Sequence, residues 1–247
     1  MIDLHSHVLP GLDDGAADMD EALAICRAAA EDGIEVLAAT PHVRAHDWPT
    51  TAEQMEAAFA ALSAAAEGIV RLVPGGELDI EELNRPLEEL RRFALAGNPR
   101  YLLVETPYYG WPLDMADRLF ALRADGITPV LAHPERNADV QMRPELLEPL
   151  VSTGTLTQVT AGSVDGRLGR RAHACAMTLI ENGWAHIVAS DGHAPSVREI
   201  GMRAAADAVG DEALAEWLTV GVPRAIVDDA RLPERPEPKK KRRFGVF

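Results

Sequence analysis

Short apolar runs alternate with amphipathic stretches along most of the chain. Seven runs have the length and composition of buried strands, and they are predicted at 1–4, 35–40, 69–73, 101–105, 127–133, 156–160 and 186–190. Apolar residues at helical spacing predict helices at 18–32, 50–67, 79–95, 113–125, 144–152, 167–182, 196–208 and 211–220. Capping residues support the first two helices. Asp18 is placed to cap the start of the first helix, and Gly33 follows its end. In the second helix, Thr51 stands at capping-box spacing from Gln54.

The alternation of strands and helices predicts an α/β fold with a parallel sheet and right-handed crossovers. Seven such units in 247 residues favour a closed or nearly closed β/α barrel. An open doubly wound sheet is the alternative, but no G-x-G-x-x-G motif follows the first strand. We expect one domain over residues 1–232, followed by a Pro-rich linker and a basic tail over residues 233–247.

Composition is that of an ordinary soluble globular protein, with 47% hydrophobic and 26% charged residues. The sequence predicts neither a membrane span nor a signal peptide, so we expect a cytoplasmic protein. Cys26 and Cys175 fall within predicted helices and are interpreted as core residues.

The net charge of −15 argues against nucleic-acid binding. All three lysines (Lys239, Lys240 and Lys241) lie in the tail beside Arg242 and Arg243. Residues 1–238 therefore contain no P-loop, Schiff-base or carbamylated lysine. The tail itself favours either an unstructured end or weak, salt-sensitive contact with an anionic membrane surface.

Polar residues with metal-binding capacity recur where the predicted strands end. His5 and His7 are two residues apart at the end of the first strand, so their side chains point the same way. The residues at successive strand ends are His7, His42, Glu77, Glu105, His133, Thr160 and Asp191, at intervals of 27 to 35 residues. Loops add Asp14 and His193, which makes five histidines and four carboxylates at one face of a barrel.

Nine such residues exceed the three protein ligands that a single catalytic zinc uses, so two or three metal ions are predicted. Imidazole and carboxylate ligands without thiolate suit Mn²⁺, Fe²⁺ or Zn²⁺. Such a centre can hydrolyse a phosphate ester. His46, His173 and His186 lie outside this pattern and are interpreted as structural or exposed.

The motifs resemble those of the polymerase-and-histidinol-phosphatase (PHP) superfamily, and most closely its CpsB/YwqE-type metal-dependent protein-tyrosine phosphatases. The similarity rests on His5-x-His7, on the segments 11–15 and 40–42, on Gly76-Glu77, on the His-Pro-Glu-Arg run 133–136, and on Asp191-x-His193. It implies a distorted seven-stranded (β/α)7 TIM-like barrel of the PHP type. It also implies manganese as the metal, with iron or zinc possible.

The resemblance further implies an assignment of ligands to three metal ions. His5, His7, Glu77 and Asp191 would hold the first ion, and Glu77, Glu105 and His133 the second, with Glu77 bridging. Asp14, His42 and His193 would hold the third, although Asp13 could exchange roles with Asp14. Arg136 and Arg198 would bind the phosphate, because a guanidinium group matches its oxygens in pairs.

The predicted function is hydrolysis of protein phosphotyrosine, with an autophosphorylated bacterial tyrosine kinase of capsule or exopolysaccharide synthesis as the expected substrate. The first alternative is a small-molecule phosphatase such as histidinol-phosphate phosphatase. A metal-dependent amidohydrolase also begins with His-x-His, but the missing lysine counts against its carbamate-bridged form. A metal-binding regulator without activity is a third alternative, which no lost ligand supports. A Cys-x5-Arg phosphate loop is absent.

Overall fold

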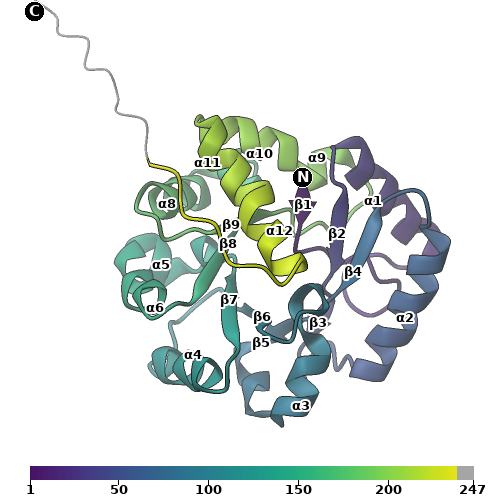
Figure 1. Cartoon of the computed structure of the whole chain (residues 1–247), viewed down its shortest axis with the longest axis horizontal. Coiled ribbons are helices and arrows are strands. Elements are labelled where there is room, and N and C mark those ends of the chain that lie inside the picture. Colours follow the sequence, from purple (N-terminus) through teal and green to yellow (C-terminus); the bar gives the residue numbers. More distant parts are fainter. Residues whose placement is uncertain (238–247) are drawn as a thin grey trace, which may run out of the picture.

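The computed structural model describes residues 1–237, apart from the side chains of Val197 and Arg198. The basic tail therefore lies outside the described residues. Over the described part, the molecule is an α/β structure in which helices surround centrally placed strands (Figure 1). All strand pairs within the two sheets are parallel, as the alternation of strands and helices predicts.

The strands form two sheets. The first has the order β1-β2-β4 and consists of β1 (Ile2–Asp3), β2 (Val36–Ala39) and β4 (Arg71–Pro74). The second has the order β3-β5-β6-β7-β8-β9 and consists of β3 (His42–Val43), β5 (Glu77–Asp79), β6 (Tyr101–Glu105), β7 (Thr128–Ala132), β8 (Leu156–Thr160) and β9 (Ile187–Ala189).

The described residues contain nine strands where seven are predicted, because pairing resumes in two short strands, β3 and β5, just beyond the predicted strands 35–40 and 69–73. Pro41 lies between β2 and β3, and it has no N–H for the ladder. Gly75 and Gly76 lie between β4 and β5, where a Cβ on Gly76 would come within 2.9 Å of the Phe93 ring. Both breaks fall just before a candidate metal ligand.

Backbone hydrogen bonds also link the segments after β1 and β9. The Asp191 N–H donates to the His5 carbonyl at 2.9 Å, and the His7 N–H donates to the Gly192 carbonyl at 2.9 Å. The end of β1 is thereby held beside the end of β9.

The longer helices agree with the sequence pattern. They are α1 (Met19–Glu31), α2 (Ala52–Ala65), α4 (Met115–Ala124), α8 (Arg170–Glu181) and α10 (Met202–Val209). Asp18 caps α1 by accepting the Glu21 N–H, and Thr51 forms the predicted capping box with Gln54. These contacts satisfy backbone N–H groups that would otherwise lack partners at the start of each helix.

Other predicted helices are broken into short pieces. The region 79–95 is not one helix, because Pro86 separates η1 (Ile80–Asn84) from α3 (Leu87–Leu90), with η2 (Arg91–Phe93) and η3 (Leu95–Gly97) following. Gly201, in a left-handed conformation, separates α9 (Val197–Ile200) from α10. The remaining short pieces are η4 (Pro134–Arg136), α5 (Ala138–Met142), η5 (Pro144–Leu147), α6 (Glu148–Ser152), α7 (Ala161–Val164), α11 (Glu212–Glu216), η6 (Trp217–Gly221) and α12 (Val222–Val227).

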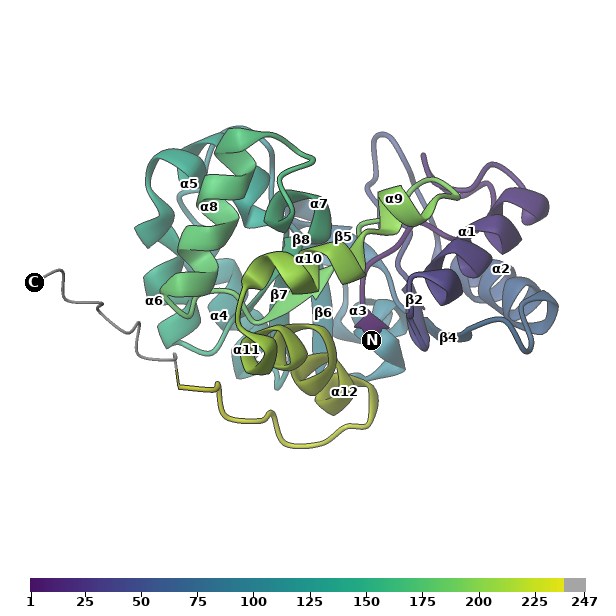
Figure 2. The same cartoon turned by 90° about the horizontal axis from the view of Figure 1, so that it is seen from above.

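One cluster of buried apolar side chains extends from Ile2 to Ile226. Helices α11 and α12 lie on the side of the molecule where the N-terminus is marked (Figure 2). The segment after α12 contacts the same body, since the Trp217 indole donates to the Pro233 carbonyl at 3.0 Å. None of the helices in the described part of the chain combines the length and apolarity that crossing a bilayer requires.

Candidate metal centre

The nine predicted ligands come from six separate places in the chain and lie together at the ends of the strands. His5, His7 and Asp14 follow β1, Glu105 ends β6, His133 follows β7, and Asp191 and His193 follow β9. His42 and Glu77 begin β3 and β5, where they are paired neighbours in the sheet. Their donor atoms form four overlapping groups, and the donor atoms of each group lie within 4.8 Å of one another. The groups are His7, Asp14, His42 and His193; His5, Glu77 and His133; His5, His7 and Asp191; and His42, Glu77 and Glu105.

The first part of the centre is built around the two histidines that follow β1. Their Nε2 atoms are 3.2 Å apart. Asp191 Oδ1 lies 3.3 Å from His5 Nε2 and 3.2 Å from His7 Nε2. Glu77 Oε2 lies 3.4 and 3.5 Å from the same two nitrogens. These donors converge on one small space, as a shared cation requires.

Glu77 connects this part of the centre to the next. Its Oε1 is 2.8 Å from His133 Nε2, and its Oε2 is 2.9 Å from His42 Nδ1. Glu105 Oε2 lies 3.6 Å from the same His42 nitrogen. The Glu77 carboxylate is thus the central group, with different histidines on its two oxygens.

His42 also reaches the more open part of the centre. Its Nε2 is 3.6 Å from Asp14 Oδ1, which lies 3.3 Å from His193 Nε2. Asp14 is half exposed, so this part faces solvent. The donor groups overlap more than the expected partition does. His42 faces both the second and the third group of expected ligands, and His7 also lies within the group of Asp14, His42 and His193.

A divalent cation fits the unsatisfied chemistry of this site. Glu77 Oε2 and His42 Nδ1 are buried and face each other at 2.9 Å, but neither atom forms a hydrogen bond to any residue that the structure describes. Burial opposes the charge on Glu77, but His5 and the contact with His133 hold its pKa well below the usual range. Burial and the charge of Glu77 together raise the pKa of Glu105. Two neighbouring buried carboxylates call for positive charge between them.

Asp13 lies outside the four groups of donors, which include Asp14, and contacts the second ring nitrogen of His7. Asp13 Oδ2 lies 2.7 Å from His7 Nδ1 and accepts the His42 N–H at 2.9 Å. Its other oxygen accepts the Gly15 N–H at 3.0 Å. A carboxylate on the second ring nitrogen fixes the orientation of a metal-binding histidine. Gly15 is needed here, because a Cβ would come within 2.0 Å of the His7 carbonyl oxygen.

Asp13→Asn is therefore expected to weaken metal binding by roughly 10- to 100-fold while the fold is retained. The amide keeps the shape of Asp13 but loses the charge that holds His7. Competition with a chelator of known affinity measures the change, with Asp20→Asn on the exposed face of α1 as the matched control. Equal metal affinity in both variants would contradict the supporting role.

Three residues near the centre are missed by the sequence analysis. Gln158 on β8 places Oε1 2.9 Å from His5 Nδ1. Arg44 donates to Glu105, and the Trp48 ring stacks on His42 at 4.8 Å between centroids. Arg44 follows His42 by two residues, a spacing that could have indicated a shared strand face. Gln158 precedes the strand-end residue Thr160 by the same two residues, whereas Trp48 carries no comparable pattern.

Arg136 lies at the edge of the centre. It donates from Nη1 to Asp191 Oδ2, and its guanidinium carbon is 4.9 Å from the Tyr108 ring centroid. The backbone of His133, three residues earlier, is left-handed with φ of 36°, and that of Asp191 is left-handed with φ of 55°. The side chain of Arg198, the other predicted phosphate ligand, lies outside the described residues.

His46, His173 and His186 lie outside the four groups of donors. Both cysteines are buried free thiols, as predicted. Burial raises the pKa of Cys26 to about 11 and that of Cys175 to about 12. Neither thiol is suited to act as a nucleophile at neutral pH.

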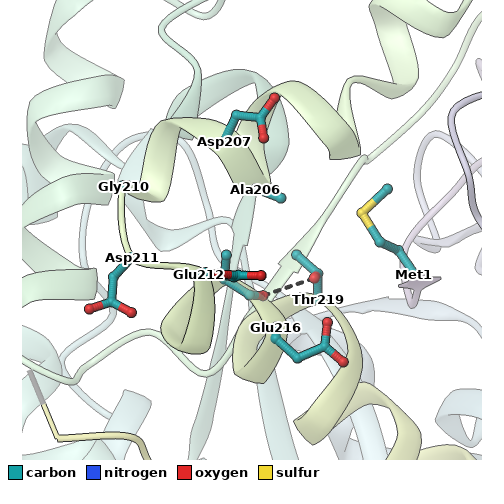
Figure 3. Close-up of a pocket in the computed structure, with 9 residues that line it drawn as sticks. Met1, Ala206, Asp207, Gly210, Asp211, Glu212, Glu216 and Thr219 are labelled. Atoms are coloured by element: carbon teal, nitrogen blue, oxygen red, sulfur yellow. Dashed lines mark hydrogen bonds between the residues drawn. The ribbon is translucent and has the colours of Figure 1, made fainter.

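A separate cavity of about 560 Å³ lies near the start of β1, beside Met1 (Figure 3). Its other lining residues come from α10, α11 and η6 and from the turn between α10 and α11. They include Asp207, Asp211, Glu212 and Glu216, but none of the nine predicted ligands. The metal centre is at the other end of β1, so this cavity is no part of it.

The chain is similar to tyrosine-protein phosphatases over most or all of its length. Tyrosine-protein phosphatase YwqE of Bacillus subtilis (strain 168) is 31% identical over 258 aligned positions, covering 100% of both chains. CapC of Staphylococcus aureus is 30% identical over 78% of this chain and 77% of its own length.

A solved structure from work on YwqE of Bacillus subtilis and CpsB of Streptococcus pneumoniae, described as unique metal-dependent tyrosine phosphatases, matches with a TM-score of 0.85. It is 29% identical and covers 98% of this chain and 100% of its own. The family model described as capsular polysaccharide synthesis, CpsB/CapC, matches residues 1–222. The chain belongs to the CpsB/CapC family.

Proposed function

We propose that this protein is a metal-dependent protein-tyrosine phosphatase that acts in capsular or exopolysaccharide synthesis. The observation that carries the proposal is the convergence of five histidines and four carboxylates at one end of the strands. The full-length similarity to a named tyrosine-protein phosphatase supports the same activity. An autophosphorylated bacterial tyrosine kinase is the substrate that we propose.

The nine residues would hold two or three divalent ions, with manganese as the proposed metal and iron or zinc as alternatives. When bound, such ions activate a water molecule and neutralise phosphoryl oxygens. The carboxylate of Glu77 would serve two of the ions, since its two oxygens face different histidines. His42 would stand between the second and third ions, because both of its ring nitrogens face carboxylates.

Arg136 would bind the phosphoryl group of the substrate. Asp191 and Tyr108 hold its guanidinium beside the candidate ligands, with its side chain still 27% exposed. A planar guanidinium matches two phosphate oxygens and stabilises the charge that develops on them during transfer. Arg198 remains a predicted second phosphate ligand on the basis of the sequence alone.

The finer features of the architecture are also proposals. The hydrogen bonds between the ends of β1 and β9 support a closed, distorted seven-stranded barrel, in which β2 with β3 and β4 with β5 each count as one interrupted strand. We propose residues 1–232 as the phosphatase domain. A cytoplasmic location and a weak membrane contact through the tail stay predictions from the sequence.

The test compares hydrolysis of a phosphotyrosine peptide, a phosphoserine peptide and histidinol phosphate by the full chain. With Mn²⁺ present, we expect the phosphotyrosine peptide to react fastest, and removal of metal by a chelator to abolish turnover. Added Mn²⁺ should restore activity, and alkylation with iodoacetamide should not reduce it, because Cys26 and Cys175 are buried. Much faster turnover of histidinol phosphate would show a small-molecule phosphatase instead.

A further inference from the structure

The loop between β6 and α4 exposes large apolar side chains beside the metal centre. We call residues 106–113 the rim loop. Tyr109 is 85% exposed and Leu113 is fully exposed, whereas Tyr108 is 38% exposed. Single exposed apolar residues are common on protein surfaces. Here, two fall within five residues of one another, next to candidate catalytic groups.

The rim loop is attached to the segment that carries Arg136. Asn137 donates from Nδ2 to the carbonyls of Pro107 at 2.5 Å and Gly110 at 3.2 Å. The Ala138 N–H donates to the Tyr108 carbonyl at 3.0 Å. These bonds fix the position of the loop relative to Arg136, the residue just before Asn137.

Tyr108 also joins the loop to the metal centre itself. Its ring lies parallel to that of His133, with 5.9 Å between centroids, and the Arg136 guanidinium lies over it. The next residue, Tyr109, turns to solvent. The rim loop therefore begins beside the proposed phosphate site, at Tyr108, and carries its most exposed apolar side chains further along, at Tyr109 and Leu113.

We infer that the rim loop binds the polypeptide segment around the phosphotyrosine, and that Tyr109 and Leu113 contact apolar side chains adjacent to it. The inference rests on the proposed function and names the substrate class more closely. A phosphotyrosine that reaches Arg136 carries its own backbone across the rim of the site. Along the rim loop, that backbone meets apolar side chains, so apolar flanking residues bury surface there. A small phosphate has no group that extends to this loop.

The test uses two synthetic phosphotyrosine peptides that differ only at the flanking positions, leucine in one and serine in the other. Wild-type protein should have a kcat/KM about tenfold higher for the leucine peptide, since even partial burial of a leucine side chain against apolar groups strengthens binding by about that factor. In the double variant Tyr109→Ser with Leu113→Ser, we expect the ratio of the two kcat/KM values to fall to about 1. Phe120→Ser is the matched control, because Phe120 is 65% exposed but lies on α4, and it should keep the wild-type ratio.

Several outcomes would overturn the inference. A kcat/KM ratio near 1 in the wild-type protein, or an unchanged ratio in the double variant, would show that the loop does not contact the flanking residues of the substrate. A dimer that dissociates in the double variant, measured by light scattering, with the peptide ratio retained, would identify a second copy of this chain as the occupant. If wild-type protein hydrolyses histidinol phosphate but no phosphotyrosine peptide, both the inference and the proposed function fail. If wild-type protein hydrolyses both phosphotyrosine peptides equally well, the inference fails but the proposed function stands.

Discussion

Glu77→Gln should remove at least one metal ion per chain and lower turnover of a phosphotyrosine peptide by at least about 100-fold. Loss of residues that merely orient ligands lowers metal affinity or activity by roughly 10- to 100-fold, and loss of a shared ligand should exceed that range. The amide has nearly the same shape, so the fold should persist. Metal content per chain and turnover are measured on the same preparation, with circular dichroism to check the fold.

Glu216→Gln is the matched control for Glu77. Glu216 lines the cavity near Met1 and lies outside the four groups of candidate ligands. This variant should keep the wild-type metal content and turnover. Near-normal turnover and unchanged metal content in Glu77→Gln would contradict the bridging role of this carboxylate.

The second large effect is expected at Arg136. Arg136→Met should lower kcat/KM for phosphotyrosine by about 100- to 1,000-fold, the usual effect of removing a group that stabilises transition-state charge. Methionine keeps part of the apolar contact with Tyr108 but cannot donate to phosphate oxygens. Arg136→Lys should recover only part of the activity, because lysine restores the charge without the paired donors.

Arg143→Met is the control for Arg136. Arg143 follows α5, is 57% exposed and lies 3.9 Å from Asp139. Its removal should leave kinetics unchanged. If Arg136→Met loses metal in proportion to activity, Arg136 acts by holding Asp191 rather than by binding phosphate, so metal content decides between the two roles.

The sequence predicts best those elements that have a clear apolar run or a capping residue. The strands β6 and β8 have the predicted bounds, and α1 begins after Asp18 as expected. These positions are determined locally, by apolar runs and by side chains that cap neighbouring N–H groups.

The breaks could not be placed in the same way. Leucines and acidic residues at helical spacing over 79–95 predict one helix, although Pro86 interrupts it in the structure. The apolar run that ends at Thr40 does not indicate that strand pairing resumes at His42. Where a strand stops and resumes depends on its partner strands. In this protein Pro41 and the pair Gly75–Gly76 act together, because β2 pairs with β4 and β3 pairs with β5.

The metal centre follows from the sequence more closely than the surrounding groups do. Strand-end spacing brings the nine predicted ligands into the described groups of donors. It does not separate Asp13 from Asp14, because adjacent carboxylates in a loop have no fixed periodicity. The contact of Gln158 with His5 joins residues 153 positions apart. Only the folded backbone determines which polar side chain stands behind a ligand.

The left-handed backbone at His133 and Asp191 has a consequence for stability. Neither residue is glycine, so each conformation costs about 1–3 kcal/mol relative to an ordinary one. A ligand that binds only the folded chain contributes about 2.7 kcal/mol when its concentration is 100 times its Kd. Metal binding can therefore offset much of the strain stored at these two positions. The unfolding temperature of the chain is then expected to rise with the concentration of the bound metal.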